Sequence, residues 1–273
     1  MSVHVVLIDA MNLIRRIYAV QERPFLLNNE LADNTKQQVL HNTQQACNVA
    51  LNNIIEQTSP THALAVFDSL TPGWRYQLYP DYKAGRKKMP QHLADTLPSI
   101  QDGFMEQHVD SLISETDEAD DLIATLAIKV ALRGQKVTII STDKCFLSLI
   151  GNHIHVYDYF NRRQLDESYT REKFDVAPGQ LMELWTLTGD STNKIPGVPG
   201  IGQVTAAALL NKYGSLQAIL NASDIKASVR DKLAKHHDDI TLAKKLLQLK
   251  QDIPLGFNLK DIRLPLAEFT ESQ

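Results

Sequence analysis

The chain has 273 residues, of which 43% are hydrophobic and 22% charged, a composition typical of globular proteins with a sizeable buried core. No apolar stretch approaches the ~20 residues that cross a bilayer, and no basic segment precedes the first apolar run, which argues against a membrane span and a signal peptide. The two cysteines, Cys47 and Cys145, form neither a metal-type pair nor a disulfide framework, so we expect a cytoplasmic protein.

Charge is segregated along the chain, although the net charge is only −4. Acidic residues gather at 117–121, and basic residues gather at 83–88 and recur between 226 and 250. The net charge argues weakly against nucleic acid as a partner. An anion-binding protein with a carboxylate metal site has this distribution too, because the acids of the site lower the total.

Strands and helices alternate in the first half. Short apolar runs rich in β-branched residues predict buried strands at 3–8, 63–67, 137–140 and 154–157. Helical spacing predicts helices at 36–57 and 118–132, and the segment 21–33 lacks a period and is predicted to be a loop. The alternation predicts an α/β domain with a mainly parallel sheet.

Helices dominate the second half, where we predict them at 178–188, 202–213, 215–221 and 226–250. A segment rich in glycine and proline, residues 195–202, interrupts them and is called the knot below. We therefore divide the chain into an α/β domain (1–168), a helical region (169–255) and a C-terminal tail (256–273), which carries no clear signal.

Three aspartates follow predicted strands. Asp9, Asp68 and Asp143 each lie at or just past the end of an apolar run. In open α/β sheets, ligands bind beyond the carboxyl ends of the strands. Three carboxylates at that edge would repel one another unless a cation lay among them. Each alone is more often a turn residue, so the joint pattern carries the prediction of a metal site.

A fourth group of acids opens the 118–132 helix. Asp117 suits the N-cap position, and carboxylates in a first turn favour the positive end of the helix. An acidic helix start is usually a cap or a solvated face, but Glu118, Asp120 and Asp121 exceed what capping needs. Oxygen ligands without a cluster of histidines or cysteines favour Mg²⁺ or Mn²⁺ over zinc.

Two further segments have the chemistry of phosphate contacts. The basic loop, residues 81–88, combines four cations with Tyr82, whose ring could stack on an unpaired base, although a run of charge is usually a solvated loop. The glycines of the knot expose backbone N–H groups at the start of a helix, a ready phosphate site, although a tight turn between helices has the same composition.

Together these segments resemble the 5′-nuclease (flap endonuclease) family, which includes the 5′–3′ exonuclease domain of bacterial DNA polymerase I, and most closely its stand-alone bacterial members of the exonuclease IX type. The resembling residues are 7–13, 66–68, 79–86, 118–121, 141–144 and 189–202, in family order. The resemblance implies a PIN-like catalytic domain whose carboxylates bind two divalent ions that promote phosphodiester hydrolysis. It also implies that the knot belongs to a helix-three-turn-helix that binds duplex backbone without base readout.

The resemblance assigns roles by position. Asp9, Asp68, Glu118 and Asp120 would bind the first Mg²⁺, and Asp121, Asp143 and Asp190 would be shared or second-site ligands, with Asp120 where the two sites meet. Lys83 and Arg86 would contact the scissile phosphate at the base of an arch over the 5′ strand. The knot would bind K⁺ through the backbone carbonyls of Leu187, Thr188, Pro196, Val198 and Ile201. The residues facing the DNA phosphate would be Gly200, Ile201, Gly202, Gln203, Val204 and Thr205.

The sequence departs from the family pattern at two positions. Cys145 and Asn193 stand where the family usually has aspartates. A thiol and an amide supply less negative charge, so the second metal site is depleted by about two charges. We therefore expect one Mg²⁺ to bind firmly and a second weakly or only with substrate.

These features favour a structure-specific 5′ flap endonuclease of replication and repair, acting on branched DNA, with no small-molecule cofactor and a monomeric state. Cys145 and Asn193 favour an alternative, a DNA-junction binding protein with attenuated nuclease activity. A PIN-type ribonuclease is a third possibility, which the knot disfavours because such domains do not need it.

Overall fold

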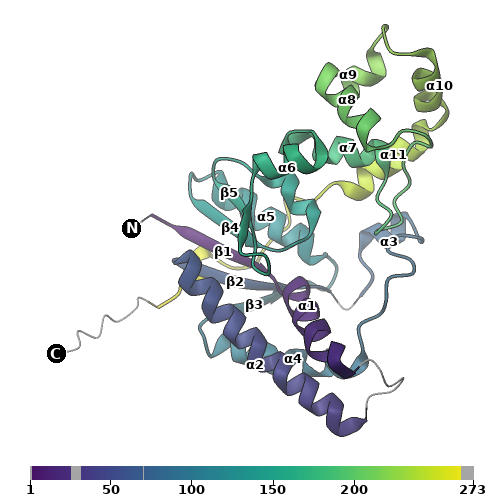
Figure 1. Ribbon diagram of the computed structural model, residues 1–273. Coiled ribbons are helices and arrows are strands. Elements are labelled where there is room, and N and C mark those ends of the chain that lie inside the picture. Colours follow the sequence, from purple (N-terminus) through teal and green to yellow (C-terminus); the bar gives the residue numbers. More distant parts are fainter. Residues whose placement is uncertain (1, 26–31, 70, 266–273) are drawn as a thin grey trace.

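A six-stranded sheet forms the centre of the molecule (Figure 1). In the computed structural model, which describes residues 2–25, 32–69 and 71–265, the strands lie in the order β3-β2-β1-β4-β5-β6. Neighbouring strands are parallel except β5 and β6. The strands span His4–Asp9 (β1), His62–Phe67 (β2), Asp110–Ile113 (β3), Lys136–Ile140 (β4), Ile154–Asp158 (β5) and Arg163–Leu165 (β6). The predicted α/β fold with a mainly parallel sheet is confirmed.

The four predicted strands are present, and β3 and β6 are additional. Strands β1 and β2 are buried along their whole length, so they stand out in the sequence as continuous apolar runs. Strand β3 is half-exposed, and β6 has only 3 residues. Edge strands of this kind offer neither an apolar run nor a long alternation, and therefore escape prediction from sequence.

Helices cover both faces of the sheet (Figure 1). Side chains alternate across each strand, so β1 contributes to two cores. On one face Val6 and Ile8 pack against α1, α2 and α4, and on the other Val5 and Leu7 pack against α5 and the C-terminal helices. The bounds of these helices are Ala10–Glu22 (α1), Asp33–Thr58 (α2), Gln91–Met105 (α4) and Ala119–Ala131 (α5).

The predicted loop at 21–33 is wrong at both ends. Gln21 and Glu22 complete α1, Arg23–Phe25 forms a 3-10 turn (η1), and Asp33 already begins α2. Residues 26–31 of that predicted loop lie outside the described residues. The helix ends are polar and at least partly exposed, so the apolar periodicity stops before the helices do.

The second half is helical, as predicted. Its helices span Glu167–Phe174 (α6), Leu181–Thr188 (α7), Gln203–Tyr213 (α8), Leu216–Asn221 (α9), Ala227–Lys235 (α10) and His237–Leu247 (α11). The single helix predicted for 226–250 is wrong, because the backbone of His236, with φ −109° and ψ 29°, separates α10 from α11. The break allows α11 to pack along α7 while α10 lies beside the knot.

Short elements complete the chain. They are α3 (Trp74–Leu78) and the 3-10 segments η2 (Lys144–Leu149), η3 (Pro178–Gln180) and η4 (Leu259–Ile262). Segment η4 leads back to the sheet, where Arg263 bridges to His62, so the described part of the tail lies against β2. No helix among the described residues is long and apolar enough to span a membrane.

The two halves share one hydrophobic core. Leu7 of β1, Leu122 of α5 and Leu184 of α7 belong to the same buried cluster. The helical region therefore continues the core that α5 forms on one face of the sheet. The predicted boundary near residue 168 falls in the first turn of α6 and stays a prediction.

Candidate metal centre and phosphate-binding knot

The carboxyl ends of three parallel strands bring their aspartates together. Ile8 of β1 pairs with Ala65 of β2 and with Ile140 of β4, so Asp9, Asp68 and Asp143 follow at the same edge of the sheet. Asp9 is buried, and its carboxylate accepts from the backbone N–H of Asn12 at 3.1 Å and from the Ser141 hydroxyl at 2.7 Å. Burial raises the pKa of Asp9 to about 7, with the charges of Asp68 and Asp143 adding to it.

Helix α5 adds Asp120 from its first turn. Burial, followed by the charge of Asp143, raises the pKa of the Asp120 carboxyl well above its usual value. Asp9 and Asp68 raise it further, while the nearby Lys83 ammonium lowers it. Four carboxylates from four segments thus feel one another's charge, and a proton or a cation must relieve the repulsion.

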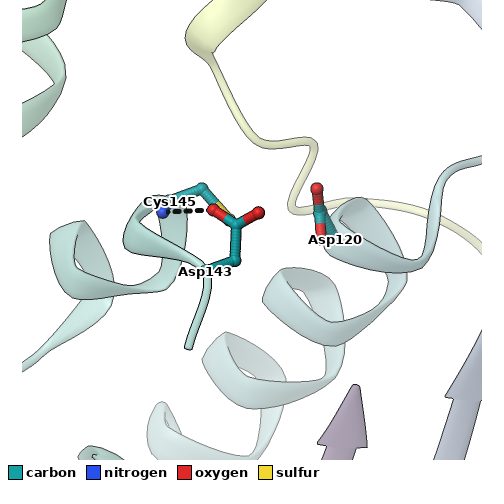
Figure 2. Close-up of side chains that lie close together, drawn as sticks. All are labelled: Asp120, Asp143 and Cys145. Atoms are coloured by element: carbon teal, nitrogen blue, oxygen red, sulfur yellow. Dashed lines mark hydrogen bonds between the residues drawn. The ribbon is translucent and has the colours of Figure 1, made fainter. Parts of the chain in front are cut away.

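Asp120, Asp143 and Cys145 can point a ligand atom each at one ion. These three atoms lie within 4.8 Å of one another, and Figure 2 shows Asp120 on α5 facing the start of η2, where Asp143 accepts from the backbone N–H of Cys145 at 3.0 Å. Burial and the carboxylates of Asp120 and Asp143 raise the pKa of the Cys145 thiol well above its usual value. Without a metal the thiol is therefore neutral and adds no charge.

One carboxylate oxygen of Glu118 accepts three hydrogen bonds, and the other accepts none. Its Oε2 accepts from Arg75 at 3.2 Å, from the Tyr82 hydroxyl at 3.2 Å and from Lys83 Nζ at 3.1 Å. Its Oε1 is buried and has no hydrogen-bond partner. A buried carboxylate oxygen without a partner is costly, whereas a cation ligated there would satisfy it. Glu118 Oε1 and the carboxylates of the three aspartates are oxygen donors of the kind that hard divalent ions prefer, so their chemistry fits a metal site. Among the described residues, the ligand atoms that lie within 4.8 Å of one another are those of Asp120, Asp143 and Cys145.

Two acids of the 117–121 group are corrected by the structure. Asp117 is not the cap of α5. Glu118 takes that position, and Asp117 accepts from Lys250 Nζ at 2.8 Å. Asp121 is fully buried, and both of its oxygens accept from the Arg75 guanidinium at 2.8 Å. Trp74 Nε1 and the backbone N–H of Lys250 also donate to Asp121, which leaves no free oxygen for a metal ion.

Arg75 is the functional residue that the sequence did not reveal. It is buried with a relative exposure of 2%, and it donates to Asp121 and Glu118 and to the backbone carbonyls of Leu246 and Gln248. All of these partners are distant in sequence, so no local signal marks the residue. Arg75 neutralises the carboxylates behind the metal site and fixes the start of α5 against the end of α11.

The basic loop contacts Glu118 at the acidic cluster and Asn193 in the turn before the knot. Lys83 adopts a positive φ of 55° and places its Nζ against Glu118. Burial opposes the charge of Lys83, but the carboxylates of Asp120 and Glu118 outweigh it and raise the pKa of the ammonium above its usual value. Arg86 is exposed and donates to Asn193 Oδ1 at 2.6 Å. Both predicted phosphate-binding cations therefore lie next to residues of the candidate site.

Tyr82 does not fit the role of a base-stacking platform. Its ring is buried with a relative exposure of 4% and packs edge-on against Tyr76 at a centroid distance of 5.3 Å. Its hydroxyl donates to Glu118. Tyr82 is therefore a packing residue that supports the metal site from behind, because the loop folds back onto α11 and buries the ring.

Asp190 lies in the same cleft as the acidic cluster but already has partners. The cleft, about 30 Å³, is lined by Asp120, Asp143, Cys145, Asp190 and Asn193 among others. Asp190 Oδ1 pairs with Lys144 Nζ at 3.0 Å, and Oδ2 accepts from Asn193 Nδ2 at 2.7 Å. A second ion at this position would have to compete with the Lys144 ammonium.

The knot is a close crossing of two backbone segments. A Cβ on Gly197 would overlap backbone atoms of Thr188 and Gly189, so only glycine permits this approach. The backbone N–H of Val198 donates to the Leu187 carbonyl at 2.8 Å, which joins the knot to the end of α7. Of the predicted K⁺-binding carbonyls, Leu187, Val198 and Ile201 belong to buried residues, and their role stays a prediction.

Helix α8 begins directly after the knot without a side-chain cap. Gly202 occupies the N-cap position, and no side chain accepts from the first turn of the helix. The free backbone N–H groups there belong to the predicted phosphate-facing segment, in which Val204 is 84% exposed. An uncapped and accessible helix start can bind a phosphate through its N–H groups.

Comparison with known proteins agrees with this geometry. Residues 4–175 match the family described as 5′-3′ exonuclease, N-terminal resolvase-like domain, and residues 176–270 match the 5′-3′ exonuclease, C-terminal SAM fold. The chain is 65% identical over 269 residues to flap endonuclease Xni of Colwellia psychrerythraea, covering 97% of this chain and 93% of that protein. It is 46% identical to flap endonuclease Xni of Aeromonas salmonicida, covering 98% and 99%.

A solved structure shares the fold at low sequence identity. The bacteriophage T5 5′-exonuclease, solved with bound divalent zinc ions, matches with a TM-score of 0.73 at 18% identity, covering 90% of this chain and 89% of that one. The matches over the whole length and the carboxylate cluster at the sheet edge lead to one assignment: the chain belongs to the 5′-3′ exonuclease family of nucleases, among the flap endonucleases of the Xni type.

Proposed function

We propose that this protein is a structure-specific flap endonuclease that hydrolyses a phosphodiester bond of a 5′ single-stranded DNA flap close to the duplex junction, in replication and repair. The observation that carries the proposal is the buried cluster of carboxylates at the sheet edge, with the Lys83 ammonium in contact with Glu118. The uncapped start of α8 in the same fold adds a phosphate site. The acids fit metal ions, and the cations and N–H groups fit phosphates.

The metal of this proposal is Mg²⁺, held by Asp9, Asp68, Glu118 and Asp120. When bound, the ion supplies Lewis-acid stabilisation and a more acidic water. Asp143 and Asp190 are the remaining carboxylates of the cleft, but the neutral thiol of Cys145, the amide of Asn193 and the Lys144 ammonium reduce the charge available to a second ion. One firm ion and one weak ion follow from this balance.

The side chains of the basic loop act on the phosphate itself. Lys83 already lies at the acidic cluster, so its ammonium can offset the negative charge that builds up on the scissile phosphate. Arg86 approaches the same cleft through Asn193. The guanidinium and the ammonium are always charged at neutral pH, so they stabilise charge and transfer no proton.

A flap-cleavage assay tests the proposal. A labelled 5′-flap DNA is incubated with the wild-type chain or the Asp120→Ala variant, with and without Mg²⁺. Metal-dependent cutting by the wild type that is lost in the variant supports the proposal. Tight binding without cutting would instead support the attenuated junction-binding protein, which the neutral Cys145 and Asn193 favour. Cleavage restricted to RNA would indicate a ribonuclease.

The knot is proposed to bind duplex backbone together with K⁺, through the carbonyls of Leu187, Thr188, Pro196, Val198 and Ile201. We expect K⁺ to strengthen duplex binding relative to Na⁺ at matched ionic strength, because a carbonyl cage discriminates by ion size and phosphate binding alone does not. Fluorescence anisotropy with a labelled duplex checks this, and equal dissociation constants in the two salts would contradict it. A monomer acting in the cytoplasm is the state in which we expect the protein to work.

A further inference from the structure

Asn193 joins the basic loop to the turn that precedes the knot. Its backbone carbonyl accepts from the N–H of Lys83 at 2.9 Å, and its side-chain Oδ1 accepts from Arg86 Nη2 at 2.6 Å. Its Nδ2 donates to Asp190 Oδ2 at 2.7 Å. One residue thus contacts the backbone of Lys83, the guanidinium of Arg86 and a carboxylate of the cleft.

An amide can make both side-chain contacts, whereas an ionised carboxylate cannot. Arg86 has donors alone and Asp190 has acceptors alone, so the bridging group must accept on one side and donate on the other. The opposite orientation of the amide would face donor with donor and acceptor with acceptor. An aspartate at position 193 could accept from Arg86, but it would place two carboxylates at hydrogen-bond distance and would require a cation or a shared proton between them.

The bridge continues beyond Asn193. Asp190 is buried at 3% exposure, and its other oxygen pairs with Lys144 Nζ at 3.0 Å. The side chains of Arg86, Asn193, Asp190 and Lys144 therefore form one continuous series of contacts made by protein groups alone. The cleft that these residues share with Asp120 and Asp143 measures about 30 Å³.

The bridge restricts the motion of the Arg86 side chain before it binds a phosphate. Its side chain is exposed, and a free arginine loses rotamer entropy when it is immobilised on a ligand. The hydrogen bond to Asn193 fixes the guanidinium beforehand, so that less entropy is lost when it meets a phosphate.

We propose that Asn193 is a positioning residue, which holds the Arg86 guanidinium at the cleft through a bridge to Asp190 that needs no metal ion. A carboxylate at this position would depend on a second divalent ion or a shared proton to lie beside Asp190. The amide of Asn193 and the Lys144 ammonium satisfy Asp190 without either. The catalytic part of this inference rests on the proposed flap cleavage, in which Arg86 contacts the scissile phosphate.

A double-mutant cycle tests the coupling. Turnover of a 5′-flap DNA at saturating Mg²⁺ is measured for wild type, Arg86→Ala, Asn193→Ala and the double variant. We expect Arg86→Ala to be roughly 100-fold slower and Asn193→Ala roughly 10-fold slower in kcat, with little change in KM. The double variant is expected to be no slower than Arg86→Ala alone, because Asn193 acts through Arg86. Additive losses, or a loss confined to KM, would overturn the proposal.

Two controls separate positioning from general damage. Ser191→Ala changes an exposed residue of the same turn and should keep wild-type kcat. Asn193→Asp has the same shape without the donor. We expect it to need a higher Mg²⁺ concentration for half-maximal cleavage, and calorimetry should show one more bound ion than in the wild type. Wild-type cleavage by Asn193→Asp at Mg²⁺ concentrations that fill one site would argue against the amide's role.

A measurement without catalysis keeps the two proposals distinguishable. In ¹⁵N-labelled protein, the Arg86 side-chain Nε signal, assigned by its loss in Arg86→Ala, should show restricted motion in the wild type and fast motion in Asn193→Ala. If the wild type fails to cut flap DNA but this difference appears, the proposed function fails and the positioning stands. If Arg86 moves equally in both proteins, the positioning is excluded whatever the nuclease does.

Discussion

At the scale of single residues, the site is organised around Glu118 and the acids at the sheet edge. One oxygen of Glu118 binds three donors, Arg75, Tyr82 and Lys83, while the other is buried without a partner. The positions of the acids follow from the sequence, because strand ends are visible there. The donors that hold Glu118 do not, because they lie 35 to 43 residues away along the chain.

Lys83 should matter more for turnover than for binding. In Lys83→Ala we expect kcat for flap cleavage to fall roughly 100-fold, because the ammonium lies at the acidic cluster where the transition state gains charge. Affinity for duplex DNA should change less than about tenfold, since duplex binding is assigned to the knot. Steady-state kinetics and anisotropy titrations measure the two effects, with the exposed Lys87→Ala as control. Equal losses in both measurements would refute a catalytic role.

Asp9 should make the metal-free protein less stable as pH rises. Burial, with the charges of Asp68 and Asp143, holds the pKa of Asp9 at about 7, against 3.8 for an ordinary aspartate. Between these values the folded state retains a proton that the unfolded chain releases, so stability falls as pH increases from about 4 to about 7, by at most ~4 kcal/mol from this group.

Urea unfolding in EDTA at pH 5 and pH 8 measures this effect. Asp9→Asn should flatten the dependence, because the amide does not titrate, and Mg²⁺ should restore stability at pH 8 in the wild type by neutralising the carboxylates. A wild-type protein that is equally stable at both pH values without metal would contradict the raised pKa.

At the scale of secondary-structure elements, the strand ends and the knot place the functional groups. Helices α2 and α5 and the four buried strands could be predicted from their apolar residues, whereas α1 and α4 were not predicted. The edge strands β3 and β6 could not be predicted, and neither could the break between α10 and α11. Both depend on the segments against which the chain packs in the fold. The knot is visible in the sequence, since glycine and proline mark unusual backbone wherever they gather.

The knot should tolerate substitution at one glycine and not at another. Gly197→Ala forces a methyl group into the backbone of Thr188 and Gly189, and we expect a cost on the order of 1–3 kcal/mol and about tenfold weaker duplex binding. Gly202→Ala meets no atom within 4 Å and has an ordinary φ of −90°, so its stability should equal that of the wild type. Thermal unfolding and duplex titrations check this pair, and equal destabilisation by both substitutions would argue against the close crossing.

At the scale of the whole molecule, the helical region is fixed to the catalytic sheet through Arg75 and a shared core. Arg75, in α3, bridges Asp121 in α5 to the carbonyls of Leu246 and Gln248 at the end of α11. The helix ends at Leu247, and Lys250, which lies beyond it, donates its backbone N–H to Asp121. The knot and the acidic cluster therefore belong to one packed body.

Removing Arg75 should destabilise the whole fold. Arg75→Met leaves the fully buried Asp121 without its counter-ion, which typically costs about 3–5 kcal/mol. Arg171→Met breaks only an exposed pair with Glu167 and should cost less than about 1 kcal/mol. Chemical unfolding measures both, and Arg75→Met combined with Asp121→Asn should recover part of the loss. Equal losses of stability in Arg75→Met and Arg171→Met would show that the hydrogen bonds of Arg75 do not fix the helical region to the sheet.

The sequence by itself determined the α/β class, the acids at the strand ends and the knot, because each depends on local periodicity or on residues that are neighbours in the chain. The resemblance to a nuclease family rests on the same segments. Only the tertiary structure decided that Asp121 pairs with Arg75, that Tyr82 is buried and that Asn193 joins Arg86 to Asp190. Arg75 and Asp121 are 46 residues apart, and Arg86 and Asn193 are 107 residues apart. Such contacts form only when packing brings distant segments together, and a charged side chain carries no sign in the sequence of which partner it will meet.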